Sequence, residues 1–180
     1  MPRPFKIVRL GPVYLFVDNL EATAAFYQGA LGFTLTEEAT CHGERCLFLR
    51  CNTEHHSVAL LPINLREKLG FSAHSKCAAL GIQVANYRQL RAAVDFFRKQ
   101  GVQVTEAIPV ELHPGIEYSA TVRDPDSHMI QLYYAMEQIG WEEKPKPKEL
   151  RRPRKLDEWP ESLDNDSNAY LGEPYLGPWG

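Results

Sequence analysis

Two adjacent histidines and one separate histidine are the side chains of this sequence best suited to moving protons. His55 and His56 stand together just before the apolar run Val58-Ala59-Leu60-Leu61, and His113 lies beside a proline and a glycine in a loop-like segment. An imidazole changes its charge near neutral pH, so a positioned histidine can act as a general acid or base without a metal. We therefore take His56, His55 and His113 as candidate catalytic residues.

Local geometry limits what the histidine pair can do. The apolar run predicts a strand near 56–62, and neighbours on a strand point to opposite faces. Only one of His55 and His56 would then face a binding site, unless a bulge near the strand start changes the alternation. The alternative is that His55 and His56 are ordinary histidines at a strand edge and that His113 is a solvated loop residue.

The elements around these histidines occur twice along the chain. Leu15 to Val17 begins a unit that runs through an amphipathic segment to Gly32, and Ile82 to Val84 begins a second unit that runs in the same way to Gly101. Such self-similarity indicates a repeated structural unit, and each glycine stands where a helix C-terminus commonly needs a left-handed residue. Each unit continues into two apolar runs around a turn-forming cluster, which predicts a hairpin.

The repeat predicts an α+β domain of two βαβββ modules, at about 9–62 and 78–135. The expected strands lie near 11–17, 33–39, 45–51, 56–62, 79–84, 102–108, 116–123 and 128–134, with helices near 20–30 and 87–100. The domain would occupy residues 1–140. A Pro-rich, charged and aromatic extension follows at 141–180.

The extension has two interpretations. Residues 141–154 are dominated by Lys, Arg, Glu and Pro, a composition that disfavours packing. Four large aromatic residues then follow, namely Trp159, Tyr170, Tyr175 and Trp179. The extension is either a disordered tail or a strap that these aromatic residues anchor on the domain or on a partner subunit. We expect an ordered strap.

Charge and hydropathy exclude several classes of protein. The formal net charge is −3, which gives no reason to expect nucleic acid as a partner. Neither a membrane-spanning apolar run nor a signal peptide is present, so we expect a soluble cytoplasmic protein with no membrane partner. The four cysteines lack both the secretory context of a disulfide framework and the spacing of a zinc site.

Three motifs resemble one known family. The segments 17–33, 48–56 and 124–131 resemble parts of the vicinal oxygen chelate superfamily, which contains glyoxalases, bleomycin resistance proteins and type I extradiol dioxygenases. Segment 48–56 is closest to the catalytic domain of extradiol dioxygenases. The resemblance implies a curved mixed sheet that forms a cup, helices on its outer face, a small-molecule ligand and a homodimer. It also aligns His56 with the acid/base histidine of ring cleavage.

The resemblance implies a divalent metal at the base of the cup, but the aligned positions do not suit one. They are Pro12, Ala59, Ala79 and Gln131. Proline and alanine have no donor atoms, whereas an Fe(II) site of this kind needs two histidines and a carboxylate. We therefore expect no cofactor. A ring-cleaving dioxygenase that holds Fe2+ or Mn2+ in an irregular site is the alternative.

Because side chains alternate between the two faces of a strand, the aligned positions also identify the other side chains that face the cup. The candidate substrate-binding residues are Tyr14, Phe16, Gln83, Met129, Gln131 and Tyr133. A cup lined by aromatic rings and amides suits a planar, partly apolar molecule. We expect an extradiol-dioxygenase-like, metal-independent enzyme that acts on an aromatic or polyketide-like metabolite by acid/base chemistry. The alternative is a non-catalytic protein that binds and sequesters such a molecule.

Overall fold

The computed structural model describes residues 3–123, 128–140 and 143–163. Within these residues the first module consists of β1 (Ile7–Val17), α1 (Leu20–Gly29), β2 (Thr34–Cys41), β3 (Glu44–Arg50) and β4 (Val58–Pro62). A short helix α2 (Leu65–Lys68) lies in the connection to the second module. The second module contains β5 (Cys77–Val84), α3 (Tyr87–Lys99), β6 (Ser119–Arg123) and β7 (Met129–Tyr133). The described residues also include the 3₁₀ helices η1 (Val110–Leu112), η2 (Lys148–Leu150) and η3 (Leu156–Glu158).

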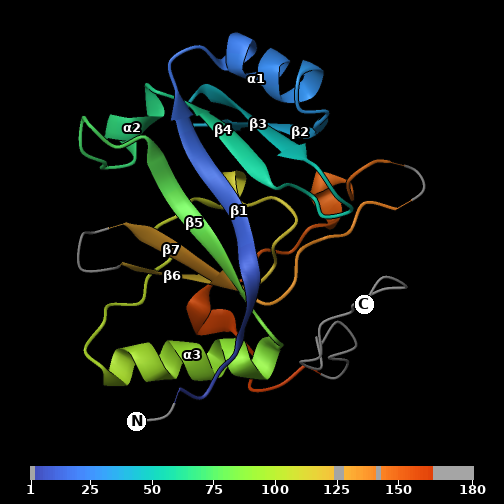
Figure 1. Ribbon diagram of the computed structural model, residues 1–180. Coiled ribbons are helices and arrows are strands. Elements are labelled where there is room, and N and C mark those ends of the chain that lie inside the picture. Colours follow the sequence, from blue (N-terminus) through green and yellow to red (C-terminus); the bar gives the residue numbers. More distant parts are fainter. Residues whose placement is uncertain (1–2, 124–127, 141–142, 164–180) are drawn as a thin grey trace.

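The strands form one mixed sheet in the order β2-β3-β4-β1-β5-β7-β6. Within each module the first strand pairs in parallel with the last, β1 with β4 and β5 with β7. The two modules join where β1 and β5 pair antiparallel in the middle of the sheet. This arrangement confirms the expected α+β class, with both copies of the repeat in one sheet (Figure 1).

The two long helices cover the outer surface of their own modules (Figure 1). Ala24 of α1 packs with Val17, Leu47, Leu49 and Leu60. The buried face of α3 forms a separate cluster with side chains of β5, β6 and β7. Asn19 and Asn86 cap the N-termini by accepting main-chain N–H groups, a role that short polar side chains perform well. The opposite sheet face is therefore left for an inner cluster.

One expected strand is wrong. The segment 102–108 makes a single bridge, between Thr105 and Thr121, rather than a ladder. Val102 and Val104 pack with the α3 cluster, whereas Ile108 packs with the inner cluster on the other side of the sheet. A regular strand would keep these even-numbered side chains on one face, so the segment must leave the sheet after Thr105.

The inner cluster fills the concave side of the sheet. Its members from β1, β3, β4, β5 and β7 include Tyr14, Phe16, Cys46, Phe48, Ala59, Leu61, Ala79 and Met129. Leu112 of η1 and Leu65 of α2 join this cluster from the connecting segments. The sheet face opposite the long helices is consequently a packed apolar layer over much of its area.

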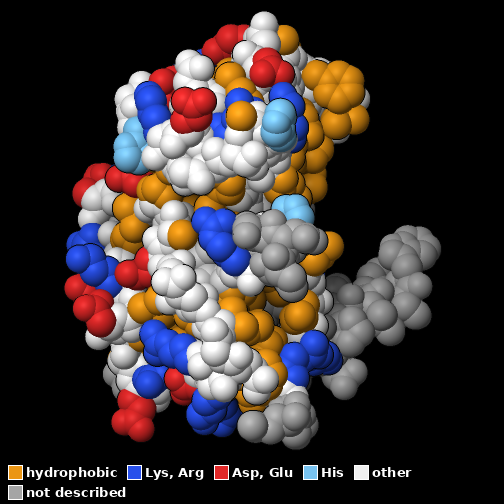
Figure 2. All heavy atoms as spheres, turned by 90° about the vertical axis from the view of Figure 1, so that its left-hand side faces the viewer, with side chains coloured by type: hydrophobic (Ala, Val, Ile, Leu, Met, Phe, Trp, Pro, Cys, Tyr) orange, Lys and Arg blue, Asp and Glu red, His pale blue; other side chains and the backbone are white. Residues whose placement is uncertain are grey.

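The part of the described extension around η3 lies against the second module. Trp159 packs against Tyr87 and Tyr118, with ring centroids 6.1 and 5.8 Å apart. The Tyr87 hydroxyl donates to the carbonyl of Pro160. Tyr170, Tyr175 and Trp179 lie outside the described residues. On the face in Figure 2, the described charged side chains of both signs are interspersed with apolar ones, and no described helix is long and apolar enough to cross a bilayer.

Candidate functional site

In the middle of the sheet a tyrosine stands between two of the positions that the family resemblance aligns with metal ligands. Tyr14 on β1 is flanked by Ala59 on β4 and Ala79 on β5, its direct neighbours in the sheet. Their methyl side chains leave space for the Tyr14 ring, which is 1% exposed. The Tyr14 hydroxyl donates to Gln131 Oε1 at 2.7 Å. The only oxygen that Gln131 could offer to a metal is therefore already a hydrogen-bond acceptor.

These residues do not fit a divalent ion. Near this point of the sheet the side chains with donor atoms include the Gln131 amide, the buried Tyr14 hydroxyl and the His56 ring, whose centroid lies 5.9 Å from that of Tyr14. Burial raises the pKa of Tyr14, which favours the neutral phenol. Iron and manganese sites in proteins rely on several imidazole and carboxylate ligands together. Among the residues that the structure describes, no three His, Cys, Asp or Glu side chains are grouped to hold a metal.

The histidine pair lies in a loop rather than in a strand. β4 begins at Val58, so His55 and His56 are released from strand alternation. Both side chains are fully buried, and both rings pack against Phe48, at 6.4 and 5.1 Å between centroids. The expectation that only one of the two faces the concave side is therefore wrong. The reason is that the main chain between β3 and β4 turns both rings inward before the ladder starts.

A carboxylate extends the pair into a linear array. His55 Nε2 lies 2.9 Å from Glu37 Oε2, and His55 Nδ1 lies 3.2 Å from His56 Nδ1. An ionised carboxylate only accepts hydrogen bonds, so Nε2 of His55 is the donor toward Glu37. In a neutral His55 the Nδ1 atom then accepts from His56 Nδ1–H. This assignment leaves His56 Nε2 with a free lone pair, as a general base requires.

The electrostatics of the array agree with that assignment. Burial opposes the charge of Glu37, but hydrogen bonds from His55 and Arg151 and the positive charge of Arg151 outweigh it and lower the pKa of this carboxyl to about 2. Burial, together with nearby His55 and His113, holds the pKa of His56 well below its usual range. At neutral pH the array therefore contains an ionised Glu37 and a neutral His56. His56 Nε2 has no hydrogen-bond partner among the described residues.

His113 approaches the pair from the loop before β6. It is 7% exposed, burial lowers its pKa, and its Nδ1 has no hydrogen-bond partner among the described side chains and main chain. Two residues later Gly115 adopts φ +79°, and a Cβ there would lie 2.9 Å from His55 Cβ. A glycine is needed at this position because the loop passes directly over His55. The loop therefore brings three histidines together.

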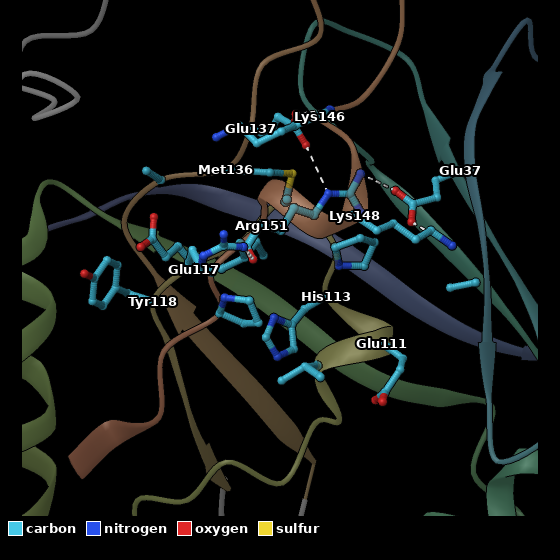
Figure 3. Close-up of a pocket in the computed structure, with 18 of the residues that line it drawn as sticks. Glu37, Glu111, His113, Glu117, Tyr118, Met136, Glu137, Lys146, Lys148 and Arg151 are labelled. Atoms are coloured by element: carbon cyan, nitrogen blue, oxygen red, sulfur yellow. Dashed lines mark hydrogen bonds and ion pairs between the residues drawn. The ribbon is translucent and has the colours of Figure 1, made fainter. Parts of the chain in front are cut away.

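A cavity of about 960 Å³ opens beside the three histidines. His113 and Glu37 line it, together with Gln83, Tyr118, Tyr134, Met136 and Glu137, and the extension closes one side with Lys146, Lys148 and Arg151 (Figure 3). Its volume lies within the range of about 300–1,000 Å³ that is usual for small-molecule sites. His55 and His56 do not line the cavity but lie behind His113 and Glu37.

The candidate substrate-binding residues divide into two groups. Gln83 lines the large cavity, where its amide also donates to the Tyr134 carbonyl at 2.7 Å. The others do not line it and are at most 4% exposed, namely Tyr14, Phe16, Met129, Gln131 and Tyr133. A space of only about 10 Å³ adjoins Tyr14 and Met129. The Tyr133 hydroxyl is buried without a hydrogen-bond partner in the described structure.

Sequence reasoning missed two residues of the site. Glu37 lies in a strand of mixed polarity, and Arg151 lies in a segment whose composition disfavours packing. Neither position carries a signal in a single sequence, because each is brought to the histidines by pairing or packing between segments far apart in the chain. The only available hint was the unusual density of cations in residues 144–155.

Comparison with known proteins places most of the chain in one family. The family model of the Glyoxalase/Bleomycin resistance protein/Dioxygenase superfamily matches residues 9–132. A curated relative, 2,2',3-trihydroxybiphenyl dioxygenase of Sphingomonas paucimobilis, is 27% identical over 134 residues. The alignment covers 74% of this chain and 44% of that protein, so the chain spans less than half the length of this relative.

Solved structures show the same fold. The 2,2',3-trihydroxybiphenyl 1,2-dioxygenase from Sphingomonas wittichii strain RW1 matches with a TM-score of 0.58 at 24% identity, over 73% of this chain and 43% of that one. Homoprotocatechuate 2,3-dioxygenase from Arthrobacter globiformis matches with a TM-score of 0.59 at 24% identity, over 77% and 39%. A Mn(II)-bound glyoxalase from Novosphingobium aromaticivorans gives 0.57 at 15% identity, over 76% and 40%.

Proposed function

Because the chain belongs to the Glyoxalase/Bleomycin resistance protein/Dioxygenase superfamily, we propose that it is a small-molecule enzyme of the extradiol-dioxygenase-like branch. Its substrate is an aromatic or polyketide-like metabolite bound in the large cavity, and its chemistry is proton transfer by histidine without a metal. The observation that carries this proposal is the group of three buried histidines beside the cavity, two of which have a ring nitrogen without a hydrogen-bond partner among the described residues.

The roles of the histidines follow from their positions. His113 stands at the cavity wall, and its Nδ1 has no partner in the part of the chain that the structure describes, so it is the group that contacts the substrate. His56 lies behind the wall, and its unprotonated Nε2 can take up or return a proton. Glu37 orients His55, and His55 in turn orients His56. A neutral imidazole with a fixed tautomer is ready to act as a base without reorganisation.

Metal independence leads to a direct test. We expect the purified protein to contain far less than one Fe, Mn, Zn or Ni per chain. Pro12, Ala59 and Ala79 occupy three of the aligned ligand positions without donor atoms, and Gln131 occupies the fourth with a neutral amide. Metabolites captured on the protein are identified by mass spectrometry, and their conversion is measured before and after chelation. Elemental analysis that gives about one metal per chain, with conversion lost on chelation, favours instead a dioxygenase with an irregular Fe2+ or Mn2+ site.

A binding function is the second candidate. It is favoured by the complete burial of His55 and His56, which leaves His113 as the single histidine among the described cavity-lining residues. A protein that only sequesters its ligand would release the captured metabolite unchanged after prolonged incubation. Conversion of that metabolite at a rate proportional to protein concentration would show that the protein is an enzyme.

We propose in addition that the chain forms a homodimer. Leu10 on β1 and Phe26 and Leu31 near α1 are each more than half exposed, and association is one way to cover such apolar side chains. We expect light scattering at micromolar concentration to give twice the chain mass of 20.5 kDa. A constant monomer mass across that concentration range would contradict the dimer.

A further inference from the structure

The C-terminal extension supplies a cation to the histidine array. Arg151 follows η2, beyond the part of the chain that the family model matches. Its side chain is 14% exposed, and one terminal nitrogen lies 2.6 Å from Glu37 Oε2. Its Nε lies 3.9 Å from Glu137 Oε2, so the guanidinium reaches between two carboxylates (Figure 3). An arginine in this position is held rather than free in solvent.

The main chain on both sides of Arg151 is fixed on the second module. Before it, the Lys146 N–H donates to the Glu137 carboxylate at 2.5 Å. After it, the Arg154 N–H donates to the Glu117 carbonyl at 2.9 Å, and Trp159 packs on Tyr118. These contacts on either side place the guanidinium at the cavity wall, so the ion pair with Glu37 does not rely on a loose tail.

Arg151 and His55 bind the same carboxylate oxygen. His55 Nε2 lies 2.9 Å from Glu37 Oε2, the atom that Arg151 also contacts, while Lys148 is 3.5 Å from Oε1 and two-thirds exposed. The charged groups that face Glu37 are therefore His55, Arg151 and Lys148, with Glu137 beyond Arg151. A buried carboxylate needs one well-placed cation, and Arg151 provides it without a proton from His55.

We propose that Arg151 is a positioning residue that keeps the histidine pair in its base form. The catalytic consequence of this inference rests on the proposed acid/base function. While the guanidinium neutralises Glu37, His55 stays neutral, accepts from His56 Nδ1–H and leaves His56 Nε2 unprotonated. Without the guanidinium, Glu37 draws a second proton onto His55. His55 Nδ1 then becomes a donor, and His56 must move its own proton to Nε2.

The test is the tautomer of each histidine in the resting protein. Nitrogen-15 NMR of wild-type full-length protein at pH 7 should show an N–H on His55 Nε2 only and on His56 Nδ1 only. In Arg151→Met we expect a second N–H on His55 and a shift of the His56 proton to Nε2. Arg151→Lys, which keeps the charge, should largely retain the wild-type pattern. Arg154→Met removes a cation from the same segment without touching Glu37 and should also retain it.

A double-mutant cycle tests whether Arg151 changes the histidine tautomers through Glu37. In the Glu37→Gln background no carboxylate remains for the cation to neutralise, so adding Arg151→Met should produce no second N–H on His55. Wild-type tautomers in Arg151→Met, or the same tautomer change in Arg154→Met, would overturn the proposal. If Arg151→Met does not fold, the comparison of Arg151→Lys with Arg151→Gln decides in the same way.

Activity is a separate readout. We expect turnover to fall at least tenfold in Arg151→Met, with the acidic limb of the pH–rate profile moved to higher pH, and to recover in Arg151→Lys. The NMR result needs no substrate, so it tests the role of Arg151 even if the protein proves to be a binder. A different outcome would contradict the proposed function alone. In that outcome the histidine tautomers depend on Arg151, but turnover stays unchanged when the histidines are replaced.

Discussion

Replacement of His113 by alanine is expected to lower turnover by about 10²–10⁴-fold, the usual contribution of a positioned acid or base. His113 is the histidine that lines the cavity, and its Nδ1 has no partner in the described structure. The affinity for the ligand should change far less, because His113 is one of many residues that line the cavity. Steady-state kinetics on the captured metabolite separate the two effects, since loss of a proton-transfer group lowers kcat more than it raises KM.

His56→Ala and His74→Ala complete this experiment. A loss of similar size in His56→Ala indicates that protons pass between the cavity wall and the buried pair. His74 is exposed and does not line the cavity, so its replacement should leave turnover unchanged. Full turnover in both His113→Ala and His56→Ala would refute the acid/base proposal and leave the chemistry to other groups at the cavity.

Replacement of Glu37 by leucine is expected to lower the free energy of unfolding by about 3 kcal/mol at pH 7, because removal of one member of a buried ion pair leaves its partner uncompensated. The substitution leaves His55 Nε2 without its acceptor, and among the described carboxylates it leaves Arg151 with the more distant Glu137. Glu38→Leu is the matched control. Glu38 is the next residue and pairs with Arg45 at the surface, so its loss should cost at most about 1 kcal/mol.

The effect of Glu37 should depend on pH with a defined sign. The pKa of Glu37 is lowered from 4.5 to about 2 in the folded protein, so its ionisation stabilises the fold above pH 4.5 and ceases to do so as the pH falls toward 2. The free energies of unfolding of wild type and Glu37→Leu, measured by denaturant titration, should therefore converge as the pH falls from 4.5 to 2. A difference that stays constant over this range would show that Glu37 acts through packing rather than through its charge.

The repeat in the sequence was sufficient to predict the fold class. The two copies, each with an apolar strand and an amphipathic segment that ends at Gly32 or Gly101, indicated two related modules. Both glycines adopt positive φ, +73° and +76°. These features are local: they depend on side-chain alternation and on backbone conformations that one residue can determine. The prediction of a strand near 102–108 was wrong because tertiary packing directs Val104 and Ile108 to opposite sides of the sheet.

The histidines themselves could also be identified from the sequence, since imidazoles are few and are the side chains that most readily exchange protons near neutral pH. Their arrangement could not. His55 and His56 both turn inward because the ladder of β4 starts only at Val58, a consequence of pairing between β3 and β4. Glu37 and Arg151 join them from positions 18 and 96 residues away from His55. The sequence by itself determined which groups could move a proton. The tertiary structure decided which carboxylate and which cation set their charge, because electrostatic interactions depend on distance in space and not on separation along the chain.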